Sequence, residues 1–317
     1  MIKKSDLLAV IDSQKERLES SSNDLERDLL KTLPSDLSQH ALIISGIRRC
    51  GKSTLLRQMI KEGNNDTFYI NFDTPKLYNF ELNDFEILDM IIAEKGFGRL
   101  FFDELQIIDG WELYVRQKLD EGYKVFVTGS NATLLSRELG TRLTGRHITK
   151  ELFPFSFQEF TNFRHLEPDK DALIKYLDLG GFPEFIRHNN ADILTTLLED
   201  ILFRDIAIRY NIRDIKSLKR LLLYLVANVG NHVTATKLTH SLGIKSSATI
   251  LDYFSFFEQS YLLNLTWTSQ NQTGKTFNFT GWNYLLKHTK GKSTSYFHVT
   301  TGSSLQAQCR KYPIARG

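Results

Sequence analysis

The sequence predicts an α/β fold in which a parallel sheet, covered by helices, is followed by a helical second part. Four short apolar runs are typical of buried parallel strands. They span 41–45, 67–72, 99–102 and 124–128. Stretches with helical spacing, 53–61 and 110–120, lie between these runs, and such alternation favours a doubly wound sheet. After about residue 155, Leu, Ile and Phe at helical spacing dominate, which indicates helices.

The remaining elements follow from the same patterns. Residues 5–33 are charged but carry spaced leucines, which predicts one or two amphipathic surface helices. Residues 217–263 have the pattern of three helices, with breaks at Gly230 and Gly243. The last 54 residues, 264–317, are rich in Thr, Ser, Asn, Gly and Lys and show no sustained period.

Composition narrows the class of protein. The chain has 317 residues, 41% hydrophobic and 24% charged, as in ordinary globular proteins of about two domains. The two cysteines, Cys50 and Cys309, form no disulfide framework or metal-type pair. No apolar run approaches the roughly 18 residues that span a bilayer, and the first residues lack the apolar stretch of a signal peptide. The sequence predicts a cytoplasmic protein without a membrane partner.

The net charge of +3 is an average of two unlike parts. After Glu258 there is no Asp or Glu, and seven of the 40 basic residues follow residue 262. Residues 1–262 therefore hold 33 basic against 37 acidic residues, a net of −4. This break in composition sets the tail apart from the body. A body of this charge argues against strong non-specific binding to nucleic acid.

The strongest motif, G-x-x-x-x-G-K-[ST], follows the first predicted strand and opens a predicted helix. Its residues are Gly46, Ile47, Arg48, Arg49, Cys50, Gly51, Lys52, Ser53 and Thr54. Glycines let the backbone N–H groups surround phosphates, and the helix adds its positive end. In such a loop the lysine reaches the β- and γ-phosphates and the serine ligates Mg²⁺. Glycine-rich turns also occur for packing alone, but the whole motif in this context favours a nucleotide site. Within the loop, Arg48 and Arg49 could contact phosphate, and charged side chains exposed to solvent are an equally good interpretation.

The second motif is the apolar run 99–102 followed by Asp103 and Glu104. Carboxylates at this place match the Walker B pattern, in which the first residue holds Mg²⁺ and the second polarises the attacking water. A strand that ends in a solvated acidic turn is the alternative, and the loop upstream makes it the weaker one.

Two further sets of residues are candidates for the same site. Thr128, Ser130 and Asn131 follow the fourth apolar run, and strand ends line the ligand crevice of doubly wound sheets. One of them could sense the γ-phosphate, or Ser130 or Asn131 could cap a helix beginning at residue 132. Arg142 and Arg146 could neutralise transition-state charge, within the chain or from a neighbouring subunit of a homo-oligomer. For both arginines the alternative is a surface position or a structural ion pair.

These motifs, in this order, resemble those of the prokaryotic AAA-type ATPases of the AAA+ superfamily that carry a C-terminal domain of unknown function. The resemblance covers about residues 20–263. It is carried by the loop and by the further segments 102–106, 110–112, 128–130, 143–146, 152–160 and 180–184. It implies an ATPase core, a helical lid and a winged-helix-like segment, with ATP binding and hydrolysis for an unnamed client. By position it makes Lys52 and Ser53 the Walker A residues and Asp103 and Glu104 the Walker B pair. It places Ser130 near sensor 1 and makes Arg146 a candidate arginine finger.

We therefore expect five regions. They are N-terminal helices at 1–35, a P-loop ATPase core at 36–155, a helical lid at 156–215, a winged-helix-like segment at 216–263 and a basic tail at 264–317. The tail departs from the family's pattern, in which strands and acidic residues continue. Our hypothesis is that it arose by a frameshift or another aberrant reading of the gene. A genuine basic tail that binds nucleic acid is the rival interpretation.

The sequence thus predicts a P-loop ATPase with ATP and Mg²⁺ as its ligands and an unknown protein or nucleic-acid client. The alternative is a nucleotide-dependent switch with negligible turnover, associated with DNA through the winged-helix-like segment. Residues 233–259 can be interpreted as a helix-turn-helix. However, Lys245 is the basic residue nearest the second helix, and the apolar stripe of that helix is more typical of a core.

Overall fold

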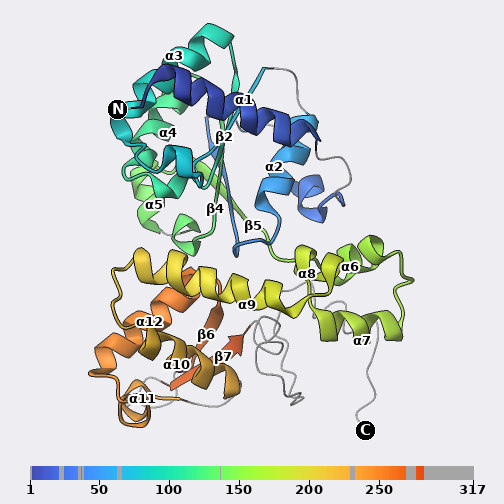
Figure 1. The fold of residues 1–317 in the computed structure, drawn as a ribbon, viewed down its shortest axis with the longest axis vertical. Coiled ribbons are helices and arrows are strands. Elements are labelled where there is room, and N and C mark those ends of the chain that lie inside the picture. The colour runs from blue at the N-terminus through green and yellow to red at the C-terminus, as the bar shows by residue number, and fades with distance from the viewer. Residues whose placement is uncertain are drawn as a thin grey trace. The chain divides into compact units, whose positions relative to one another are not determined.

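The structure is a computed structural model that describes residues 2–20, 25–34, 37, 39–62, 66–135, 137–228, 233–268 and 276–281. The chain divides into two compact units, residues 1–163 and 164–317 (Figure 1). The predicted finer division into a lid and a winged-helix-like segment stays a prediction. None of the described helices is long and apolar enough to cross a membrane.

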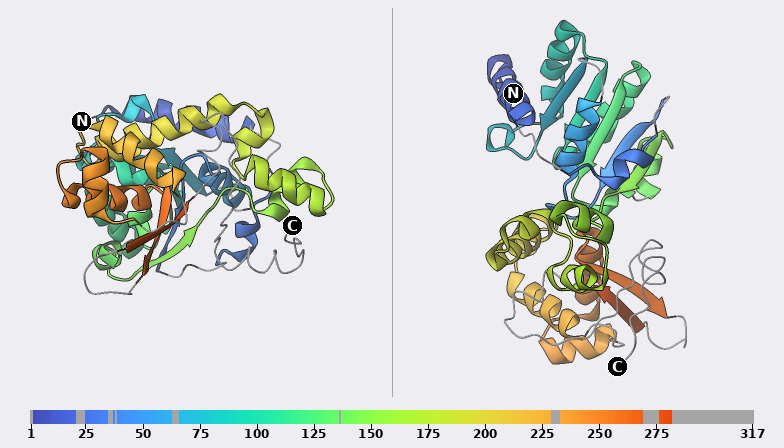
Figure 2. Two further views of the ribbon diagram at one scale, coloured as in Figure 1. Left: turned by 90° about the horizontal axis from the view of Figure 1, so that it is seen from below. Right: turned by 90° about the vertical axis from the view of Figure 1, so that its right-hand side faces the viewer.

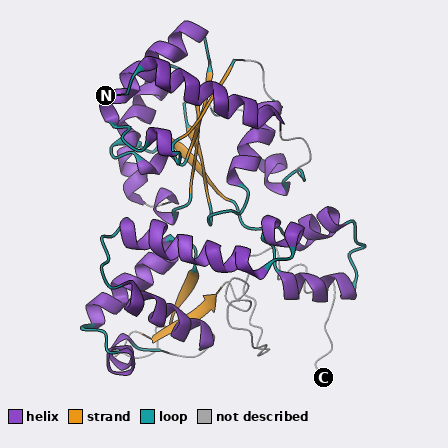
Figure 3. Ribbon diagram, in the orientation of Figure 1, coloured by secondary structure: helices purple, strands orange, loops and turns teal. Residues whose placement is uncertain are grey.

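The first unit is built on a five-stranded sheet in the order β2-β3-β4-β1-β5, and all neighbouring strands are parallel. The strands are β1 (Ala41–Ser45), β2 (Thr67–Asn71), β3 (Arg99–Asp103), β4 (Lys124–Gly129) and β5 (His147–Glu151). Every residue of β1 is buried, because β1 lies inside the sheet and helices surround the strands (Figure 3). The predicted α/β class and its parallel sheet are confirmed.

The helices of this unit precede the sheet, alternate with its strands and follow it. They are α1 (Lys4–Ser20), α2 (Lys52–Lys61), α3 (Phe85–Lys95), α4 (Trp111–Asp120), α5 (Arg137–Arg142) and α6 (Phe157–Arg164), with 3-10 turns η1 (Asp28–Thr32), η2 (Pro75–Leu77), η3 (Leu82–Asp84), η4 (Leu105–Ile107) and η5 (Ala132–Leu135). One apolar core joins residues of α1, α3 and α4 to alternate residues of the strands, among them Ile43, Phe102 and Val127. The N-terminal helix contributes Leu7, Val10 and Ile11 to this core and exposes other residues, as an amphipathic surface helix does.

The second unit is mainly helical, as predicted. Its elements are α7 (Lys170–Leu179), α8 (Pro183–His188), α9 (Ala191–Asp200), the π-helix η6 (Ile201–Ile208), α10 (Ile215–Ala227), α11 (Ala235–Leu242), α12 (Ser247–Gln259), β6 (Leu263–Thr268) and β7 (Thr276–Gly281). Figure 2 shows β6 and β7 as a pair, and they are antiparallel. Apart from Leu263, this hairpin lies in the tail, where the sequence shows no sustained period. The rest of the predicted tail lies outside the described residues.

Candidate functional site

The phosphate-binding motif forms the turn between β1 and α2. Gly51 precedes the first turn of α2 with φ of 106°, a backbone conformation that favours glycine. The Lys52 side chain is buried, and its Nζ donates hydrogen bonds to the carbonyl oxygens of Gly46 (3.0 Å) and Ile47 (3.1 Å). The ammonium group is thus held over the loop itself, where a positive charge can attract an anion.

Close packing explains the first glycine of the motif. A Cβ atom added at Gly46 would lie 2.1 Å from the carbonyl oxygen of Leu152 and 3.1 Å from the Sγ of Cys50. The Cys50 Sγ in turn approaches the same carbonyl oxygen at 3.3 Å, and burial raises the pKa of this thiol. The loop therefore rests directly on the chain that follows β5, and Cys50 serves as a small buried residue there.

Replacing Gly46 by alanine is expected to lower the free energy of unfolding by about 2 kcal/mol, because backbone atoms must move to admit the methyl group. Calorimetry of the purified variant would measure the loss. Gly140→Ala is the control: it lies in α5, and its added Cβ would meet only the Cε1 of His147, at 3.3 Å. An unfolding temperature for Gly46→Ala equal to that of Gly140→Ala would contradict the packing argument.

Asp103 ends β3 and is fully buried. Its carboxylate accepts hydrogen bonds from the hydroxyl of Thr128, the hydroxyl of Tyr69 (3.0 Å) and the amide of Asn71 (2.9 Å). The Ser53 side chain also hydrogen-bonds to it. Burial, followed by the neighbouring Glu104, raises the pKa of Asp103. The structure thus joins the predicted pair Ser53 and Asp103, and it adds Asn71, which ends β2.

Glu104 follows Asp103 in a left-handed backbone conformation, with φ of 55°. Its Oε2 accepts hydrogen bonds from Gln106 Nε2 (2.6 Å) and from the backbone N–H of Ser130 (3.3 Å), and its Oε1 lies 3.7 Å from Lys52 Nζ. Burial acts to raise its pKa, but Lys52 and these hydrogen bonds outweigh burial and lower it. Glu104 is therefore ionised at neutral pH.

Two buried polar atoms near Glu104 have no hydrogen-bond partner among the described residues: the hydroxyl of Ser130 and the Oε1 of Gln106. Buried polar atoms of this kind call for a partner that is not protein, such as water or a ligand. Ser130, predicted as a sensor, lies next to Glu104 through its backbone N–H. Gln106 was part of a matching segment, but its type gave no indication of this contact.

Three of the predicted arginines, Arg48, Arg142 and Arg146, have acidic partners. Arg48 Nη1 lies 3.3 Å from Asp73, and Arg142 Nη1 lies 2.8 Å from Glu112. Arg146 Nη1 lies 2.6 Å from Asp120, and the backbone oxygen of Arg146 accepts from the N–H of Ala41, the first residue of β1.

Arg146 therefore lies at the amino end of the strands, whereas the phosphate loop follows the carboxyl end of β1. The length of β1, about 16 Å at the usual rise of a strand, separates the two. β5 runs parallel to β1, so its first residue lies beside the first residue of β1. Arg146 precedes β5 and therefore lies at the end of the strands opposite to the phosphate loop of its own chain.

A phosphate loop at an inner strand of a parallel sheet, with a buried lysine and two carboxylates at the end of β3, defines a nucleotide-binding protein of the P-loop class. The comparisons with known proteins agree. Residues 38–161 match a family model described as an AAA domain, and residues 170–278 match a domain of unknown function, DUF8612. The second match extends past residue 263, where the sequence analysis placed the departure from the family.

Two relatives cover most of the chain. An uncharacterized protein of Methanocaldococcus jannaschii is 33% identical over 297 residues, which cover 84% of this chain and 66% of that protein. One of Haemophilus influenzae is 30% identical over 283 residues, which cover 82% and 67%. The chain thus spans about two thirds of the length of the curated relatives it matches. The chain belongs to the AAA-type P-loop family with a C-terminal domain of unknown function.

Solved structures are more distant. The Aeropyrum pernix ORC1 protein in complex with DNA is 12% identical with a TM-score of 0.32, over 76% of this chain and 83% of that one. Caenorhabditis elegans PCH-2 is 14% identical with a TM-score of 0.30, over 70% and 62%. Family membership therefore rests on the sequence matches.

Proposed function

We propose that this protein binds ATP with Mg²⁺ at residues 46–54 and hydrolyses it. The observation that carries the proposal is the convergence of Lys52, Asp103 and Glu104 beside the phosphate loop, with Lys52 Nζ 3.7 Å from Glu104. Lysine and backbone N–H groups suit the phosphates. A carboxylate that is ionised at neutral pH, as the lowered pKa of Glu104 implies, suits the orientation of an attacking water.

Ser53 and Asp103 are the residues that would hold Mg²⁺. The fit is supported by their hydrogen bond, which places a hydroxyl and a carboxylate together, both oxygen donors of the kind that Mg²⁺ prefers. Among the described residues there is no group of three or more His, Cys, Asp or Glu that could hold a metal ion. When bound, the ion neutralises charge on the phosphates. Ser130 would sense the γ-phosphate, because its buried hydroxyl has no hydrogen-bond partner among the described residues.

The role of Arg146 requires a second copy of the chain. Because it lies at the other edge of the sheet, an arginine finger at this position would act on the nucleotide of a neighbouring subunit in a homo-oligomer. Its ion pair with Asp120, which is 60% exposed, would have to open for that contact. Surface ion pairs of this kind are weak.

The proposal is tested by measuring ATP binding and phosphate release by the purified chain with Mg²⁺, with and without double-stranded DNA. We expect binding in both cases and measurable phosphate release. A protein that binds neither ATP nor ADP would overturn the proposal. Stimulation by DNA that weakens steeply with salt would identify nucleic acid as the client.

A nucleotide-dependent switch is the second candidate function, and the surroundings of Glu104 favour it. The carboxylate is held by Gln106, Ser130 and Lys52, and a base so engaged must release a contact before it can accept a proton. The switch predicts tight ATP binding, little phosphate release and a partner that is captured differently with ATP and ADP.

The helices α11 and α12 contribute less support for DNA binding. They lie where the sequence predicts a helix-turn-helix, but Ile250, Phe254 and Phe257 of α12 are buried. Of the residues exposed at its start, Ser246, Ser247 and Ala248 carry no charge, and the exposed Lys245 before them offers a single positive charge to phosphates. A protein client is therefore the proposal we favour.

A further inference from the structure

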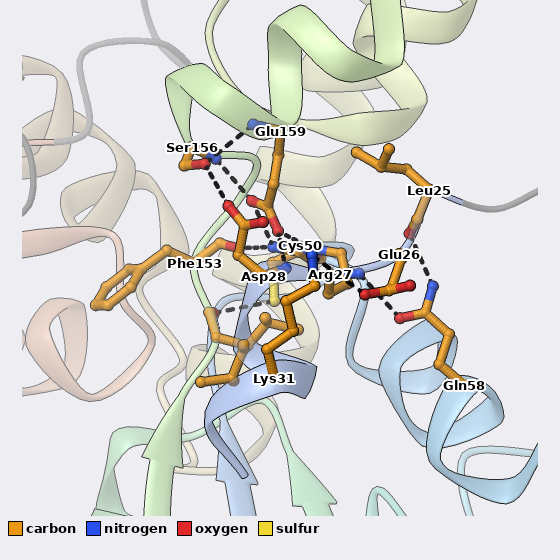
Figure 4. A network of polar contacts seen from close by, with 12 residues as sticks. Leu25, Glu26, Arg27, Asp28, Lys31, Cys50, Gln58, Phe153, Ser156 and Glu159 are labelled. Atoms are coloured by element: carbon orange, nitrogen blue, oxygen red, sulfur yellow. Dashed lines mark hydrogen bonds and ion pairs between the residues drawn. The ribbon is translucent and has the colours of Figure 1, made fainter. Parts of the chain in front are cut away.

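A buried polar network of the first unit centres on Arg27, a residue that no motif includes (Figure 4). Its side chain is only 2% exposed. Nε donates to Glu159 Oε1 (2.8 Å), Nη1 to the carbonyl oxygen of Cys50 (2.7 Å) and Nη2 to that of Phe153 (2.7 Å). One guanidinium thus joins the N-terminal segment, the phosphate loop and the chain after β5.

Glu159, itself 4% exposed, completes the network. Besides Arg27 it accepts hydrogen bonds from the backbone N–H groups of Asp28 (2.9 Å) and Ser156 (2.8 Å). The N-terminal segment is fixed a second time where the backbone N–H of Arg27 donates to Gln58 of α2 (3.1 Å). A buried ion pair is costly to desolvate and adds little stability over apolar packing, so its worth lies in the geometry that it imposes.

That geometry acts on the peptide between Cys50 and Gly51. In a trans peptide the carbonyl and the following N–H point in opposite directions. Because Arg27 holds the Cys50 carbonyl on its own side, the Gly51 N–H must point the other way, away from the guanidinium. The side of Gly51 that faces Arg27 is closed, since an added Cβ there would lie 2.8 Å from Nη1.

We propose that Arg27 is a positioning residue that fixes the Cys50–Gly51 peptide with its N–H directed at the phosphates of the nucleotide. The inference rests on the proposed nucleotide binding. Residues 25–28 then support nucleotide binding, although they contact the phosphate loop on the side opposite to the one proposed to face the nucleotide. Lysine cannot replace Arg27. The planar guanidinium donates in three directions, to Glu159 and to the carbonyl oxygens of Cys50 and Phe153, and a single ammonium group cannot reach all three acceptors.

The test compares three variants for their affinity for ADP and ATP with Mg²⁺ and for their unfolding temperature. Arg27→Lys keeps the charge beside Glu159 but loses the donor to Cys50. The double variant Arg27→Met, Glu159→Gln removes the buried charges, while Gln keeps an oxygen for the two backbone N–H groups. Lys118→Met is the control, because Lys118 is equally buried and paired with Asp89 and Glu121 on helices away from the phosphate loop.

We expect Arg27→Lys and the double variant to bind ADP and ATP about tenfold more weakly, as for one misplaced contact to a charged group. The two nucleotides should lose affinity equally, since the N–H meets phosphates that they share. The double variant leaves the carbonyl oxygens of Cys50 and Phe153 without this donor, so it should unfold below the wild-type temperature. Comparison of its affinity with that of Lys118→Met, which also loses stability, separates positioning from stability. Lys118→Met should unfold earlier and bind normally.

Folded Arg27 variants that bind ADP within twofold of the wild type would overturn the inference alone. So would a Lys118→Met variant that loses as much affinity as Arg27→Lys. Absence of nucleotide binding by the wild type would instead overturn the proposed function, and the inference with it.

Discussion

Replacing Lys52 by alanine is expected to weaken the binding of ADP and ATP by about 100-fold or more. Lys52 is the buried cation of the phosphate loop, and two contacts between a charged group and phosphate oxygens account for a loss of this size. The variant also frees the carbonyl oxygens of Gly46 and Ile47 from their donor, so the loop becomes less ordered. Titration with a fluorescent nucleotide measures the effect.

Lys61→Ala is the matched control, since Lys61 lies in the last turn of the same helix. It should bind nucleotide as the wild type does. Lys52→Ala with unchanged unfolding temperature and unchanged affinity would show that the nucleotide lies elsewhere. A second consequence concerns Glu104: because Lys52 is the main group that lowers its pKa, the pKa of Glu104 should rise in Lys52→Ala.

Replacing Glu104 by glutamine is expected to leave ATP bound while phosphate release falls by about 100-fold or more, the usual contribution of a positioned general base. Gln has the same shape and can still accept hydrogen bonds from Gln106 and Ser130 through its oxygen. It cannot accept a proton from water. Loss of a negative charge beside the phosphates should keep or tighten nucleotide binding.

Glu112→Gln is the control for this variant, because Glu112 is a buried carboxylate with an arginine partner, Arg142, outside the phosphate loop. It should release phosphate at the wild-type rate. Glu104→Gln with full turnover would contradict the assigned role of Glu104. If the wild type and Glu104→Gln both release negligible phosphate, the result would instead support the nucleotide-dependent switch.

The sequence predicted the parts of the fold whose signals are local. The apolar residues of β1, β3 and β4 are buried on both faces of the sheet, so all of them contribute to the signal. The rule that parallel strands end at one edge brought Ser53, Asp103, Glu104 and Ser130 together. The same rule applied to β2 would have found Asn71, which ends that strand and donates to Asp103.

What the sequence did not predict depends on contacts between distant residues. Arg27 and Glu159 are 132 residues apart, and a single charged residue in a polar segment carries no sign that it is buried. The edge strand β5, with His147, Thr149 and Lys150, lacks an apolar pattern because none of its residues is fully buried. Without β5 in the sheet, the position of Arg146 relative to the phosphate loop could not be derived.

The left-handed backbone conformation of Glu104 lowers the stability of the fold at a proposed catalytic residue. A residue other than glycine pays of the order of 1 kcal/mol to stay in this region, and Asn tolerates it better than Glu. The position is thus occupied by a residue that the backbone disfavours, with the carboxylate directed between Lys52 and Ser130. A Glu104→Asn exchange would lose the carboxylate at this position and reduce the strain in the backbone. Selection for thermostability alone would therefore favour replacement of Glu104, the residue that we propose to orient the attacking water.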